Sequence, residues 1–302
     1  MASSVEPTTP RVMAQGLTSA SKASTARRAL RLARRKPLGA VGLGLLAILC
    51  FVAAFAPLLA PHDPYESISG ARLLSPSFEH PMGTDNLGRD LLSRIIHGAR
   101  ISLLIGVFAG ALGTVGGLVV GVVSGYAGGW VDSAIQRVVD SMMAFPGLIL
   151  ALTLVATLGP NLRNVMIAIA VGSIPGTSRV IRGAVFSVKE EDYVSAARAL
   201  GAPGWRVAVF HIIPNVMAPV LILASVAFGT AIIAEASLSF LGLGAQPPTP
   251  SWGVMLSGPS RRFMTDAPWM AVFPGLAISL VIFGINIFGD ALRDVLDPRL
   301  RG

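Results

Sequence analysis

The segment SAARALGAPGWRVAVFHIIPN, residues 195–215, separates two long apolar runs. Small side chains recur at helical spacing before its Gly-Ala-Pro-Gly break, and an amphipathic pattern follows the break. Gly201 is well placed to end a helix in a left-handed conformation, and Pro203 cannot continue one, so the chain must turn here. The pattern predicts two short helices, over 190–200 and 205–213. Small side chains on their contact side would let another protein approach the backbone closely.

The rest of the chain has the composition of an integral membrane protein. Of its 302 residues, 53% are hydrophobic and 13% are charged, and the mean hydropathy is +0.67, which is too apolar for an ordinary soluble domain. The net charge of +8 does not indicate nucleic-acid binding, because the basic residues collect at the ends of apolar runs. The single cysteine, Cys50, excludes an intrachain disulfide.

Apolar runs bounded by charges or by Pro and Gly predict an all-α membrane protein with six transmembrane helices. Helices are required because backbone polar groups in hydrocarbon must be paired within their own segment, and no run alternates with the period of barrel strands. The predicted spans cover about 37–60, 101–125, 142–159, 164–183, 214–240 and 268–290.

Residues 1–36 predict a basic, disordered cytoplasmic tail. A cleavable signal peptide is the alternative, but the run over 37–60 exceeds the roughly 7 to 15 residues of a signal core and matches the roughly 20 that span a bilayer. With the amino terminus inside, 17 of the 24 Lys and Arg residues fall in cytoplasmic segments. This bias predicts a multi-pass protein with both termini in the cytoplasm, and Arg179 must snorkel or mark an interface.

The opening segment resembles the EAA loop of ABC importer permeases, whose pattern is Glu-Ala-Ala, three residues, Gly, nine residues and Ile-x-Leu-Pro. Serine replaces the glutamate of that motif and histidine its isoleucine, and an ordinary interfacial helix hairpin is the alternative. The residues that the resemblance assigns to ATPase coupling are Ser195, Ala196, Ala197, Arg198, Gly201, Ala202, Trp205, His211 and Pro214.

Three further stretches resemble the C-type permease subunit of peptide and nickel ABC importers. They read HPMGTDNLGRDLLSRIIHGARISL (80–103), AEASLSFLGLGAQPPTPSWGVML (234–256) and FGDALRDVLDPRLR (288–301). The resemblance implies a transmembrane permease domain over 37–302 with the type I importer fold. It also implies a cytoplasmic coupling loop over 184–213, whose helix pair rests on an ATPase and transmits ATP-driven closure to the spans.

The same resemblance implies a bacterial cytoplasmic-membrane importer that moves short peptides by alternating access. Its partners would be a second permease in a heterodimer, two ATPase domains and an extracytoplasmic solute-binding protein. Nickel or another small solute is the alternative substrate. An autonomous ion-coupled transporter, the alternative from another class, would show inverted repeats around a midplane ion site. None of the three lysines ends a G-x-x-x-x-G-K-[ST] sequence, so we expect no catalytic site and no cofactor in this chain, and ATP and Mg on a partner.

Two further groups of residues are candidates for function. Glu235 is ionisable at membrane depth, where a charge costs on the order of 2.5 to 3.5 kcal/mol, so it either lines the transport path or makes a structural hydrogen bond. Trp252 and Met255 are gate candidates in a Pro-rich loop over the outer mouth. The outer-loop family motif contributes Gly83, Asp85, Gly88, Arg89, Asp90 and Arg94. The four histidines lack a metal-binding spacing such as H-E-x-x-H, so no metal site is expected.

Overall fold

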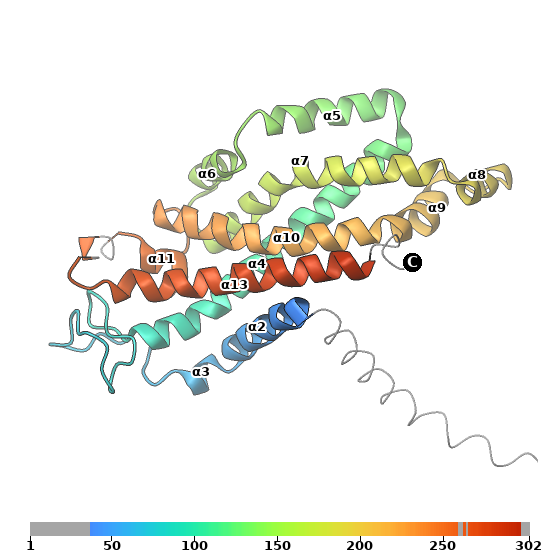
Figure 1. Ribbon diagram of the computed structural model, residues 1–302. Coiled ribbons are helices and arrows are strands. Elements are labelled where there is room, and N and C mark those ends of the chain that lie inside the picture. Colours follow the sequence, from blue (N-terminus) through green and yellow to red (C-terminus); the bar gives the residue numbers. More distant parts are fainter. Residues whose placement is uncertain (1–36, 259–261, 264, 297–302) are drawn as a thin grey trace, which may run out of the picture.

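The computed structural model describes residues 37–258, 262–263 and 265–296, and the tail predicted over 1–36 lies outside them. Within these ranges the regular structure is helical, apart from one isolated bridge between Thr84 and Asp90. The long helices form one bundle (Figure 1). One end of it carries α8, α9 and the carboxyl end of α13, and the other carries α11 and the loop that precedes α4.

The apolar runs form the helices that cross the bundle. The elements are α2 (Pro37–Ala54), α3 (Ala56–Leu59), α4 (Leu91–Ala127), α5 (Gly129–Met143), α6 (Gly147–Leu158), α7 (Leu162–Lys189), α8 (Asp192–Ala199), α9 (Gly204–Val207), the π-helical segment η1 (Ala208–Ile212), α10 (Ile213–Phe240), α11 (Trp252–Leu256) and α13 (Trp269–Leu296). Five helices are long and apolar enough to cross a membrane, and the bent pair of α5 and α6 would make a sixth span. The chain is an all-α, multi-pass membrane protein.

The second span is longer than its predicted range of 101–125. α4 begins ten residues earlier, at Leu91, and runs without a break for 37 residues. The Asp90 side chain caps its start by accepting a hydrogen bond of 2.8 Å from the Ser93 amide, and no proline interrupts the helix afterwards. At 1.5 Å per residue, α4 measures about 55 Å, well beyond the roughly 30 Å of a hydrocarbon core.

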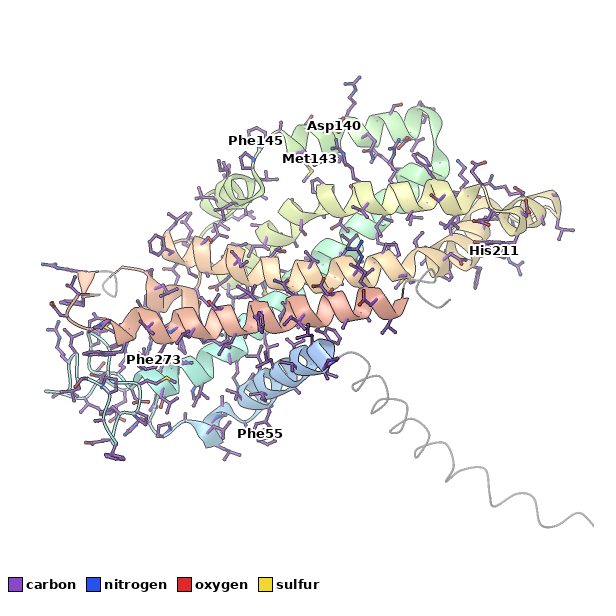
Figure 2. All side chains as sticks on the ribbon, in the orientation of Figure 1. Phe55, Asp140, Met143, Phe145, His211 and Phe273 are labelled. Atoms are coloured by element: carbon purple, nitrogen blue, oxygen red, sulfur yellow. The ribbon has the colours of Figure 1, made fainter. Side chains whose placement is uncertain are left out.

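The third span, predicted over 142–159, is a bent pair. The chain leaves the helix between Ala144 and Pro146, and α5 and α6 meet at 88°. Pro146 takes an extended ψ of 132°, and its ring disfavours helical geometry in the residue before it. The 12 residues of α6 measure about 18 Å, so α6 alone is too short to cross. Figure 2 labels Met143 and Phe145 at this bend.

The connection between the fourth and fifth spans is shorter than its predicted range of 184–213. α7 continues to Lys189, and the helix predicted over 205–213 is continuous with α10 through η1. Pro214 has no amide hydrogen to give to the carbonyl four residues earlier, and a local widening into π-helical register accommodates that loss. The second arm of the helix pair is therefore the first part of the fifth span.

A series of glycines lets α4 pack closely on two neighbours. A Cβ at Gly117 would lie 2.5 Å from the Thr177 Cβ on α7, and one at Gly110 would lie 3.1 Å from the Phe228 amide nitrogen on α10. The series consists of Gly106, Gly110, Gly113, Gly117 and Gly121. These glycines serve packing within the subunit, as small-residue faces do in membrane helices.

Candidate functional site

The turn between α8 and α9 forms as the sequence predicts. Gly201 has a φ of +78°, where a side chain would strain the backbone. The Gly201 amide donates to the Arg198 carbonyl at 2.9 Å, and the Ala202 amide donates to the Ala197 carbonyl at 3.1 Å. These bonds satisfy carbonyls at the end of α8, so the turn is held by its own backbone.

The helical tip, residues 192–212, exposes large apolar side chains. Leu200 is 88% exposed, Trp205 65% and Phe210 61%, whereas Val194 and Val207 face inward and are buried. A contiguous exposed apolar surface typically marks a protein-binding site. Of the residues assigned to coupling, the exposed ones are Ser195, Ala196, Arg198, Gly201, Trp205 and Pro214, and the half-buried ones are Ala197, Ala202 and His211.

Tyr126 at the end of α4 contacts two basic residues at this end of the bundle. The Arg198 guanidinium lies over its ring at 5.4 Å from the centroid, and the Lys189 ammonium donates to its carbonyl at 3.2 Å. Partial burial of the Tyr193 phenol and, to a smaller extent, the nearby Glu191 carboxylate raise the pKa of this phenol. Sequence reasoning missed Tyr126 because nothing in its own neighbourhood indicates a contact with residues about 70 positions later.

An ion pair joins three helices at the same end of the bundle. Arg182 on α7 donates to both carboxylate oxygens of Asp132 on α5, at 2.7 and 2.5 Å, and Ser124 on α4 donates to the same carboxylate. Arg179 pairs with Asp140, and both side chains are about half exposed. Arg179 is therefore paired with a carboxylate at the protein surface.

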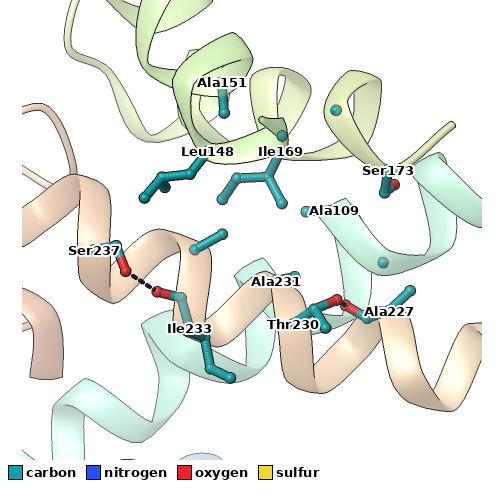
Figure 3. Close-up of a pocket in the computed structure, with 14 residues that line it drawn as sticks. Ala109, Leu148, Ala151, Ile169, Ser173, Ala227, Thr230, Ala231, Ile233 and Ser237 are labelled. Atoms are coloured by element: carbon teal, nitrogen blue, oxygen red, sulfur yellow. Dashed lines mark hydrogen bonds between the residues drawn. The ribbon is translucent and has the colours of Figure 1, made fainter. Parts of the chain in front are cut away.

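A cavity of about 350 Å³ lies between α4, α6, α7 and α10 (Figure 3). Its lining contains small and aliphatic residues and no ionisable side chain. The hydroxyls of Ser173, Thr230 and Ser237 each donate to a carbonyl of their own helix. Leu148 and Ile233 on its rim are 42% and 46% exposed, so the cavity opens on an uncovered face of the subunit.

The predicted gate residues lie elsewhere, in the interior of the other end. Glu235, Trp252 and Met255 are 1%, 2% and 5% exposed, and none of them lines the cavity. Glu235 accepts hydrogen bonds from Ser239 at 2.6 Å and from Ser251 in the outer loop at 2.7 Å. Of the two roles considered for Glu235, the structure thus shows the structural hydrogen bond, which Glu235 makes to the outer loop. Its role in the path stays a prediction without a supporting contact.

Trp252 fastens α11 to α4. Its indole nitrogen donates to the Ile95 carbonyl at 3.0 Å. A Cβ at Gly98 would come within 2.7 Å of the ring, so only glycine leaves room for it. These contacts hold the ring against α4, and its role as a gate stays a prediction.

The outer-loop motif folds into a cap around buried charges. Asp85, 4% exposed, pairs with Arg89 at 2.7 Å and lies 3.6 Å from Arg94, which is 3% exposed. Arg94 also donates to the Pro64 carbonyl at 2.9 Å. Gly83 has a φ of +75°, and a Cβ there would meet the Trp269 ring at 2.8 Å. The motif residues build the loop that closes this end of the bundle.

Comparisons with known proteins agree along almost the whole chain. A family model described as binding-protein-dependent transport system inner membrane component matches residues 117–302. A model described as N-terminal TM domain of oligopeptide transport permease C matches residues 24–76.

Two relatives are similar over most of their length. The dipeptide transport system permease protein DppC of Alkalihalophilus pseudofirmus is 45% identical over 279 residues, which cover 91% of this chain and 90% of that protein. The glutathione transport system permease protein GsiD of Escherichia coli is 43% identical over 274 residues, which cover 89% of each.

The fold has a solved counterpart in the inward-facing MetNI methionine ABC transporter. The match has a TM-score of 0.56 at 17% identity and covers 68% of this chain and 98% of that chain. At this identity the likeness concerns the fold alone, which is that of a type I importer permease.

Proposed function

The chain belongs to the family of binding-protein-dependent transport system inner membrane components, and from this premise we propose that it imports short peptides across a bacterial cytoplasmic membrane. It is the permease subunit of an ABC importer and not an enzyme, and it works with an ATPase and a substrate-binding protein. The autonomous ion-coupled transporter is not favoured by relatives that are permease proteins of binding-protein-dependent systems.

The observation that carries the proposal of an ATPase-driven importer is the exposed apolar surface of the helical tip. Its exposed apolar side chains, including Leu200 and Trp205, have no covering partner among the described residues. An ATPase groove that received them would bury them. The ATP and Mg would be bound by that partner, in its two ATPase domains. Both termini of this chain would lie on the same cytoplasmic side.

The continuity of the tip with α10 suggests how ATPase closure reaches the transport path. Helical structure runs from Gly204 to Phe240, through η1. Six residues of the same helix line the cavity, namely Ala227, Thr230, Ala231, Ile233, Ala234 and Ser237. A displacement of the tip would therefore move one wall of the cavity, which is the step that alternating access requires.

A second permease would complete the path. The cavity opens on a face where Leu148 and Ile233 are exposed, and a heterodimer partner placed there would supply the opposite wall. The neutral lining imposes no charge on a passing solute, and this suits peptides of varied side chains. The two relatives named above transport a dipeptide and glutathione according to their names, and both substrates are short peptides.

The test is co-purification of partners from the native membrane in mild detergent. We expect the wild type to bring down an ATPase and a second permease, and Gly201→Asp to lose the ATPase. Gly242→Asp is the matched control, because Gly242 has a similar φ of +81°, is also exposed and begins the turn at the opposite end of α10. Isolation of the wild-type chain alone, and folded, would overturn the proposal.

Substrate class is tested separately, with the purified complex in proteoliposomes. ATP-dependent uptake of a labelled dipeptide should exceed uptake of Ni²⁺ when the binding protein is present. Uptake of Ni²⁺ without peptide uptake would overturn the proposal of a peptide substrate, but it would not contradict ATP-driven import.

A further inference from the structure

Two histidines and an aspartate from three parts of the outer loop meet at the start of α4. His62 follows α3, His80 lies in the middle of the loop, and Asp90 caps α4. His80 and Asp90 are 3% and 1% exposed. The two imidazole rings lie with their centroids 4.9 Å apart, and one ligand atom from each of the three residues lies within 4.8 Å of the others.

The distances fit a metal ion with little movement. The Nδ1 of His80 is 2.9 Å and the Nδ1 of His62 is 3.8 Å from the same oxygen, Oδ1 of Asp90. Ligand atoms in a tetrahedral zinc site, with bonds of about 2.0 to 2.1 Å, lie about 3.3 Å apart. The two distances lie on either side of this value, and one ligand atom from each residue lies within 4.8 Å of the other two, so rotations of these side chains would bring three ligand atoms around one ion.

One hydrogen bond lies within the cluster: Nδ1 of His80 and Oδ1 of Asp90 are 2.9 Å apart, and a bound metal ion would replace the proton that they share. Oδ2 of Asp90 accepts from the Ser93 amide at 2.8 Å, which fixes the carboxylate and leaves Oδ1 facing the histidines. The Nδ1 of His62 is buried and has no hydrogen-bond partner. A buried polar atom without a partner is costly, and a bound cation would supply the missing partner.

We propose that His62, His80 and Asp90 bind a divalent transition metal of the zinc class, with water in the fourth position. Two imidazoles and a carboxylate are ligands that this class of metals accepts. His62 is about one-third exposed, which leaves a route for the ion and the water. Bound metal would fasten the outer loop to α4. The site is independent of the proposed transport function.

The experiment uses the full chain in detergent, purified through a tag without histidine and stripped with a chelator. Titration with Zn²⁺ should give one equivalent bound, and Co²⁺ should give the visible absorption of a tetrahedral site. His62→Ala should weaken Zn²⁺ binding by at least about 100-fold, since even outer-shell changes cost 10- to 100-fold. Zn²⁺ should raise the thermal midpoint of the wild type and not that of the variant.

His97→Ala is the matched control. The Nδ1 of His97 contacts the Ser93 carbonyl at 3.0 Å and takes no part in the cluster, so this variant should bind Zn²⁺ like the wild type. His62→Gln provides a second test if the alanine variant does not fold. No binding by the wild type at micromolar Zn²⁺, or equal binding by a folded His62 variant, would overturn the proposal and leave a hydrogen-bonded cluster without metal.

Discussion

The two ends of the bundle differ in which side chains they expose and which they bury. At the helical tip, large apolar residues such as Leu200 and Trp205 stay in the open. At the opposite end, which carries α11 and the loop that precedes α4 and which we call the outer end, ionisable residues such as Asp85, Arg94 and Glu235 are almost completely buried. Each arrangement is costly for an isolated chain, since exposed apolar surface favours association and buried charge requires a partner.

The difference lies in where the compensating contact comes from. The buried charges at the outer end find their partners within the chain, in the pairing of Asp85 with Arg89 and in the serine hydroxyls around Glu235. The apolar side chains of the tip have no such cover among the described residues. Substitutions at the outer end should therefore change folding stability, whereas substitutions at the tip should change association.

The largest effect is expected for Asp85→Ala. The variant leaves the Arg94 guanidinium buried beside an empty position, and breaking a buried pair costs about 3 to 5 kcal/mol of stability. Unfolding by a denaturing detergent, followed by circular dichroism, measures the change. Glu66→Ala is the control, because Glu66 is an exposed acid in the same loop. Equal stability of the two variants would show that the outer charges do not hold this end together.

Trp205→Ala should show the opposite behaviour. We expect a loss of about 2 kcal/mol in ATPase binding, or about 30-fold in affinity, because exposed aromatic residues at interfaces are typical hot spots. The stability of the isolated chain should not change. Trp130→Ala is the control, since Trp130 is 81% exposed on α5, outside the tip. A Trp205 variant that unfolds easily and still binds the ATPase would contradict the distinction between the two ends.

Glu235→Gln tests the outer end in a milder way. Glutamine keeps a carbonyl oxygen that can accept from Ser239 and Ser251, so stability should fall by about 1 kcal/mol or less. Transport by the assembled complex should continue, because the side chain does not line the cavity. Abolished transport with the complex intact would instead show that Glu235 takes part in transport.

Local features of the sequence predicted the turn at Gly201 correctly. A left-handed helix end followed by Pro203 is determined within a few residues, so its signal is complete in the sequence. The bend at Pro146 was missed for the opposite reason. Pro175 and Pro274 lie inside long helices of the same chain, because membrane bundles tolerate proline. Sequence alone does not distinguish a proline that breaks a helix from one that a helix retains.

Contacts between distant segments could not be predicted. His62, His80 and Asp90 are 28 residues apart at most, without any metal-binding spacing, and only the path of the outer loop brings them together. Likewise, Glu235 meets Ser251 because the chain reverses after α10. The periodicity of apolar residues located the helices, whereas the polar contacts depend on loop paths that periodicity does not describe.

The smallest effect is expected for the exposed pair of Arg179 and Asp140. Both side chains are about half exposed, and such pairs contribute about 0 to 1 kcal/mol because water already solvates the separated charges. Asp140→Asn should therefore change the unfolding free energy by less than about 1 kcal/mol, whereas Asp132→Asn, which alters the buried partner of Arg182, should cost more. Similar losses in the two variants would mean that charge pairing itself stabilises the bundle. A large difference would show that burial decides, as it does at the outer end.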